Sequence, residues 1–137
     1  MPKSALFSVF LSAVIFAGLI PFLEINDTHL TNPGWPAHAR LHEAWQLITN
    51  ASLSILAVAL VWNGKAPRIG MIIALIISLS FLVSWAFGSA YGGSVLRADG
   101  TQMAIGGLNV AVLIVLILTA FLLFGYRAVS KHTVTPK

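Results

Sequence analysis

The sequence predicts an all-α integral membrane protein, a four-helix bundle with the N-terminus and the C-terminus in the cytoplasm. Two observations predict this class. Hydrophobic residues make up 58% of the 137 residues and charged residues only 9%, whereas a soluble domain carries roughly 25% charged residues. The apolar residues are also gathered into blocks separated by short polar segments. The chain therefore has too little polar surface to face water on all sides, and its length allows one domain.

Four apolar stretches are long enough to cross a bilayer, since about 20 helical residues span roughly 30 Å of hydrocarbon. They are Ala5–Leu23, Ala44–Trp62, Ile69–Tyr91 and Met103–Phe124. None contains His or a charged residue, which are costly at mid-membrane depth. The second helix should start before its apolar run, because Pro36 suits the first turn of a helix. A single domain, 1–137, should thus have spans at about 5–23, 37–62, 69–91 and 103–124.

The basic residues fall on one side of the predicted membrane and the acidic residues on the other. One side carries Lys3, Lys65, Arg68, Arg127, Lys131 and Lys137. The other carries Arg40 and Arg97 with all four acids, Glu24, Asp27, Glu43 and Asp99. By the positive-inside rule the first side is cytoplasmic. We therefore expect a multi-pass protein of the bacterial inner (plasma) membrane.

The composition also limits cofactors and partners. The chain has no cysteine, which excludes disulfides, thiolate metal sites and c-type haem attachment. Its net charge of +4 is dispersed over helix ends, so no nucleic-acid partner is expected. The expected partners are membrane lipids and a lipophilic small molecule. Small residues at helical spacing, such as Gly70 and Ala74, would also allow a homodimer or a larger membrane complex.

Almost all the unusual side chains lie between Glu24 and Asn50. The outer loop, 24–36, ends in Asn32-Pro33-Gly34-Trp35, a pattern typical of a turn. A helix from Pro36 to Asn63 would be roughly 42 Å long at 1.5 Å per residue, which is longer than the hydrocarbon layer. Its first two turns should therefore stand in the outer interface, and they carry His38 and His42.

The helical spacing predicts a continuous polar strip on this second helix. At 100° per residue the strip comprises His38, His42, Glu43, Gln46, Thr49 and Asn50. Arg40 points elsewhere. The candidate catalytic residues are His38, His42, Asp27, Glu24, His29 and Arg40. The candidate substrate-binding residues are Trp35, Glu43, Gln46, Asn50, Trp85 and Asn109. A cavity open to the outside would unite His42, Gln46, Asn50, Trp85 and Asn109; alternatively, the amides bond one another and hold the helices together.

Three functions remain open at this point. The first is a membrane enzyme without a cofactor that acts on a lipophilic substrate by proton transfer, as in isomerisation, cyclisation or epoxide opening. His38 and His42 would be acid and base, Asp27 or Glu24 would orient one imidazole, and Trp85 would stack against a cationic intermediate. The second is a protein that binds a divalent metal through His29, His38 and His42. The third is a non-catalytic accessory subunit or lipid-binding protein, in which the polar residues only anchor the helix among the headgroups.

The run from Thr28 to His42 resembles the signature T-H-x-x-N-P-x-W-P-x-H-A-R-x-H of an uncharacterised family of small four-span membrane proteins. The acid that precedes this signature is displaced here, because Asp27 stands directly before Thr28. The resemblance covers about fifteen residues and the four-span layout, and it implies a fold and a candidate site but no activity. The architecture is also distantly similar to EXPERA (sterol-isomerase-like) membrane domains, with which the chain shares no motif. In those bundles His and Glu serve as proton donors and acceptors, and fold alone does not carry that function over.

Overall fold

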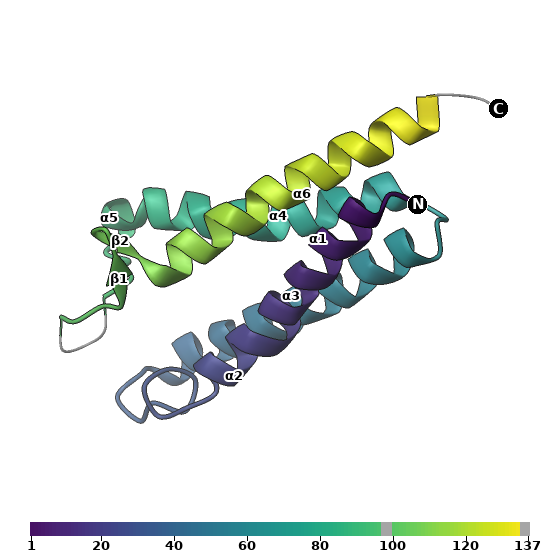
Figure 1. Cartoon of the computed structure of the whole chain (residues 1–137). Helices are drawn as coiled ribbons and strands as arrows, with labels where there is room; N and C mark the ends of the chain where they lie inside the picture. Colours follow the sequence, from purple (N-terminus) through teal and green to yellow (C-terminus); the bar gives the residue numbers. More distant parts are fainter. Residues whose placement is uncertain (97–99, 135–137) are drawn as a thin grey trace.

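The computed structural model describes residues 1–96 and 100–134, so Arg97, Asp99 and Lys137 lie outside the described residues (Figure 1). In the described part of the chain, four helices are long and apolar enough to cross a membrane. They are Lys3–Glu24, Ala37–Trp62 (α3), Pro67–Ala86 (α4) and Val110–His132, the last within α6 (Val110–Val134). The predicted class, an all-α membrane four-helix bundle, is confirmed, and the second span has the expected bounds.

The first span is continuous but not uniformly α-helical. It consists of α1 (Lys3–Ala13), a π-helical segment, η1 (Val14–Leu19), and α2 (Ile20–Glu24). Pro21 has no backbone N–H, and its ring crowds the carbonyl four residues earlier. A wider π-helical turn just before it accommodates this break. The sequence analysis did not anticipate the π-helical segment.

The outer ends of the third and fourth spans differ from expectation. α4 ends at Ala86, and Gly88–Tyr91 forms a separate short helix, α5. The segment before α6 forms an antiparallel hairpin of β1 (Ala104–Ile105) and β2 (Leu108–Asn109). Gly106 and Gly107 have φ of +60° and +83°, as a two-residue hairpin turn requires at both central positions. The predicted bounds 69–91 and 103–124 are therefore wrong at the outer ends.

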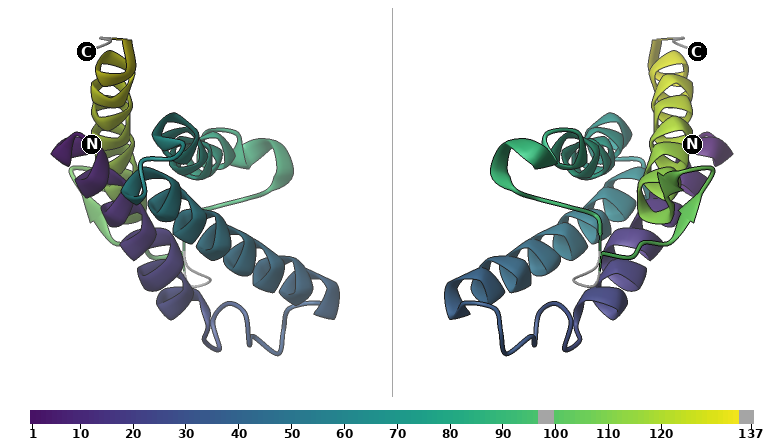
Figure 2. Two further views of the ribbon diagram at one scale, coloured as in Figure 1. Left: turned by 90° about the vertical axis from the view of Figure 1, so that its right-hand side faces the viewer. Right: turned by 90° about the vertical axis from the view of Figure 1, so that its left-hand side faces the viewer.

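The helices converge at one end of the bundle and diverge at the other (Figures 1 and 2). The end where they converge has the N-terminus, the last turns of α6 and the α3–α4 turn, and we call it the basic end. It carries Lys3, Lys65, Arg68, Arg127 and Lys131. The buried residues of α4 lie between Gly70 and Ser78, whereas Val83 and Phe87, nearer the outer end, are 55% and 64% exposed. The buried residues of α4 thus lie in the part of the helix nearer the basic end.

Two glycines allow this close packing. A Cβ at Gly70 would lie 2.7 Å from the carbonyl oxygen of Ala57 in α3, and one at Gly125 would lie 2.6 Å from Oγ of Ser8 in α1. Small residues at such points let helix backbones approach, which is a main source of helix association in a bilayer. Gly125 was not recognised from the sequence.

Gly70→Ala and Gly125→Ala should each destabilise the bundle by about 1–3 kcal/mol, because a methyl group has no room between the helices. The unfolding midpoint in a mild detergent measures the effect. Gly18→Ala is the matched control, since nothing lies within 4 Å of a Cβ at that position. An equal effect at all three glycines would contradict the packing argument.

A second prediction concerns orientation. Because the chain has no cysteine, Ala37→Cys and Lys65→Cys each introduce a unique thiol at an exposed position. In intact cells a membrane-impermeant maleimide should label Ala37→Cys, and it should label Lys65→Cys only after permeabilisation. The reverse pattern would invert the assigned topology.

Candidate functional site

The outer loop between α2 and α3 is ordered by two asparagines. Oδ1 of Asn26 accepts hydrogen bonds from the backbone N–H (2.7 Å) and the hydroxyl (2.6 Å) of Thr28, and its amide donates to the carbonyl of Leu23. Oδ1 of Asn32 accepts from the N–H of Gly34 at 2.8 Å. Such Asx turns replace the missing backbone ladder of a loop. The local sequence therefore folds the loop largely by itself.

The loop brings His29 against Glu24, the last residue of α2. Nε2 of His29 lies 3.5 Å from Oε2 of Glu24, and Nδ1 lies 2.8 Å from Oγ1 of Thr28. The Thr28 hydroxyl has one proton, which it donates to Asn26, so Nδ1 of His29 must supply the proton of its own bond to Thr28. Nε2 of the same ring is then left facing the Glu24 carboxyl group across the start of the loop.

In this arrangement both ring nitrogens of His29 are engaged in contacts within the loop. The side chain therefore has a structural role there. Its ring also meets Trp35 edge-on, with the ring centroids 6.1 Å apart. Glu43, in the second turn of α3, is near enough to Glu24 to act on it electrostatically. Asp27 is engaged elsewhere, accepting a hydrogen bond from the Thr31 hydroxyl at 2.9 Å.

His38 and His42 form a pair of their own on α3. Their Nε2 atoms are 3.0 Å apart, and the rings are nearly perpendicular, with centroids 4.5 Å apart. The ring of Trp45 lies 5.9 Å from that of His42 at an interplanar angle of 31°. A hydrogen bond between two imidazoles needs one N–H and one free lone pair. The pair therefore holds a proton donor and a proton acceptor at one place.

The structure does not unite His29 with this pair. Among the described residues, no group of three or more His, Asp or Glu side chains is placed to hold a metal ion. The two imidazole nitrogens supply two ligands, whereas zinc sites in proteins use at least three protein ligands. Arg40 is half-buried in the first turn of α3, and within the described part of the chain no hydrogen bond joins it to His38 or His42.

The polar strip lies on α3 as the spacing predicted. His38, His42, Gln46 and Thr49 are exposed, and Glu43 and Asn50 are half-buried. Gly70 of α4 lies against Ala57 and Val61. At 100° per residue these two residues share a helix face with Gln46 and Asn50. The deeper part of the strip therefore faces the side of α3 from which α4 diverges.

Asn109 and Trp85 lie away from this strip. The Asn109 amide donates to the carbonyl of Val95 at 3.3 Å, and its Oδ1 accepts from the N–H of Ala111 at 2.9 Å. It thus caps the start of α6, and in the described residues no hydrogen bond joins it to Gln46 or Asn50. Asn109 is placed by the hairpin, which the sequence analysis had assigned to the fourth span.

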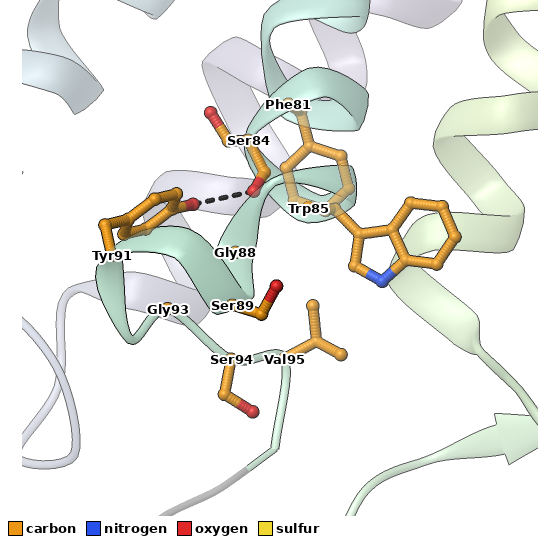
Figure 3. Close-up of a pocket in the computed structure, with 9 residues that line it drawn as sticks. All are labelled: Phe81, Ser84, Trp85, Gly88, Ser89, Tyr91, Gly93, Ser94 and Val95. Carbon is orange, nitrogen blue, oxygen red and sulfur yellow. Dashed lines mark hydrogen bonds between the residues drawn. The ribbon is translucent and has the colours of Figure 1, made fainter.

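Trp85 lines a pocket of about 320 Å³ built from the outer end of α4, α5 and the following loop (Figure 3). Its walls include Phe81, Ser84, Trp85, Ser89, Tyr91 and Val95. The Tyr91 hydroxyl donates to the carbonyl of Ser84 at 2.7 Å, which fastens α5 to α4. The sequence analysis expected one cavity lined by His42, Gln46, Asn50, Trp85 and Asn109. Among the described residues that line this pocket, only Trp85 belongs to that set.

Sequence reasoning missed two parts of the site. Trp45 stands three residues after His42, a spacing that places neighbours on one helix face, so it could have been found. The Asn26–Thr28 bonds follow a common Asx-turn pattern and could also have been anticipated.

The fold and these contacts define a four-span membrane protein with two histidine-containing clusters at its outer end. The Glu24–His29 pair holds the loop, and the His38–His42 pair is exposed on α3. Comparisons of the chain with protein families, with curated proteins and with solved structures found no match. The function must therefore be argued from the site.

Asn26→Ala should loosen the outer loop, because it removes both acceptor bonds to Thr28. Each such bond contributes about 0.5–1.5 kcal/mol, so amide exchange over residues 26–32 should accelerate by roughly tenfold or more. Hydrogen exchange followed by mass spectrometry measures this. Asn63→Ala, at the exposed α3–α4 turn, is the control. Unchanged exchange in Asn26→Ala would mean that the side chain does not order the loop.

Proposed function

We propose that this chain is a small membrane enzyme that acts by proton transfer on a lipophilic substrate, with His38 and His42 as its acid and base. The observation that carries the proposal is the 3.0 Å separation of their Nε2 atoms. Imidazole exchanges protons near neutral pH, and a paired donor and acceptor is the equipment of general acid–base catalysis. No cofactor is required for such a step.

The surroundings of the pair support a lipophilic substrate. Leu41, Trp45 and Ile48 are all more than half exposed on α3, so apolar surface flanks the two imidazoles. The helix start also lies at the level where headgroups meet hydrocarbon. A substrate could enter laterally from the bilayer with its apolar part in the membrane and its reacting carbon or oxygen beside the histidines.

Other side chains near the His38–His42 pair would assist it in catalysis. Trp45, next to His42, takes the stacking role that the sequence suggested for Trp85, because an indole face stabilises a nearby cation. Gln46 and Asn50 continue the strip and can bind polar groups of the substrate. Glu24 and His29 hold the loop beside it.

An isomerisation of this kind balances without a co-reactant. One imidazole removes a proton from a carbon of the substrate while the other delivers a proton to a second carbon, and a double bond moves between them. Water from the interface resets the two rings to one donor and one acceptor. Epoxide opening would instead add one water molecule to the substrate.

The test uses solvent deuterium. Wild-type protein is reconstituted in vesicles of total lipid from the expression host, in D2O, and the lipids are analysed by mass spectrometry. A lipid that gains deuterium, or D2O, with time is the expected result. Because acid–base groups contribute about 10²–10⁴-fold to rate, His38→Ala/His42→Ala should slow the gain at least about 100-fold.

His132→Ala, a histidine at the opposite end of the bundle, is the matched control and should leave the rate unchanged. A mass gain that persists in the double variant would contradict the proposal. The absence of any mass gain with the wild-type protein would contradict it as well. Metal analysis of tag-free protein adds a second arm. Near-stoichiometric metal that disappears in the double variant would favour a metal protein instead.

A further inference from the structure

A second cavity opens at the basic end, far from the histidine pair. It has a volume of about 390 Å³ and is formed by the start of the chain, the α3–α4 turn and the last turns of α6. Its lining includes Met1, Trp62, Asn63, Gly64, Pro67 and His132. None of the lining residues is acidic, whereas Glu24, Asp27 and Glu43 all lie at the other end of the bundle. Among the described residues, the Lys and Arg side chains Lys3, Lys65, Arg68 and Arg127 at this end have no acidic side chain beside them.

Three cationic residues adjoin the lining in sequence. Lys3 follows Pro2, Lys65 follows Gly64, and Arg68 follows Pro67. Nη2 of Arg68 donates to the carbonyl of Ser130 at 3.0 Å, which ties α4 to α6 beside the cavity. Lys3 and Lys65 are exposed. α4 also starts here, and its first N–H groups and helix dipole add positive potential.

The depth of the cavity is marked by Trp62. This residue ends α3, is 64% exposed and contacts Phe10 edge-on at 5.5 Å. Tryptophan in membrane proteins concentrates where headgroups meet hydrocarbon. The cavity thus lies at the level of lipid phosphates.

We propose that this cavity binds the phosphate headgroup of an anionic membrane lipid. Lys3 and Lys65, which adjoin the lining in sequence, would pair with the phosphate, and Trp62, which lines the cavity, would lie at the glycerol level. The proposal is independent of the proposed enzymatic function, because it uses residues at the opposite end of the bundle.

The test is native mass spectrometry of delipidated protein in a mild detergent, titrated with phosphatidylglycerol and, separately, with phosphatidylcholine. Saturable binding of one phosphatidylglycerol per chain and much weaker binding of phosphatidylcholine are expected. Lys65→Gln should raise the Kd roughly fivefold and Lys3→Gln/Lys65→Gln roughly 25-fold, since each basic residue at a membrane surface contributes comparably. Both affinities should fall at high salt.

Arg127→Gln is the matched control. It removes the same charge at the same end, but at 100° per residue Arg127 lies about 160° around α6 from the lining residue Val129, so its Kd should change less than about twofold. Equal weakening by Lys65→Gln and Arg127→Gln would show a diffuse basic surface and overturn the site. Equal binding of phosphatidylcholine would also overturn it. Displacement of the lipid by equimolar inorganic phosphate would show that the cavity takes free phosphate rather than a lipid.

Discussion

The close approach of the helices at the basic end is the constraint on which the rest of the structure depends. In a bilayer, apolar side chains gain little by leaving lipid for protein, so helices associate mainly through tight packing and interhelical bonds. Gly70 supplies such packing between α4 and α3, and Gly125 supplies it between α6 and α1. The small buried residues of α1, Ala5, Ser8 and Ser12, lie in the same half of the bundle. Here the backbones are held together, and toward the outer end they separate.

Local hydrogen bonds order the loops at the outer end of the bundle. Asn26 binds Thr28, the Glu24–His29 pair closes the start of the loop, and Tyr91 fastens α5 to α4. These bonds hold the loops near their helices without covering α3. The His38–His42 pair and the upper part of the polar strip are therefore left accessible.

The sequence predicted what the bilayer dictates and missed what depends on local backbone geometry. The apolar lengths gave four helices, Pro36 marked the start of α3, and the i, i+4 spacing predicted that His38 and His42 share a face. The π-helical turn before Pro21 and the Gly106–Gly107 hairpin were missed, because both depend on dihedral angles that hydropathy does not encode. Trp85 and Asn109 were grouped with the strip by assuming parallel outer halves. The divergence of α4 from α3 is set by packing elsewhere, so no pattern within those segments reveals it.

The depth of the His38–His42 pair in the bilayer depends on the depth of the basic end. α3 has 26 residues, which is about 39 Å at 1.5 Å per residue, and the hydrocarbon layer is roughly 30 Å thick. With Trp62 at one interface, about six residues of α3 must extend past the other, and the residues at that end are Ala37 to His42. A tilt of about 20° shortens the vertical span by only a few ångströms. A headgroup that fixed Trp62 at one surface would therefore also place both imidazoles at the opposite surface, where interfacial water can exchange protons with them.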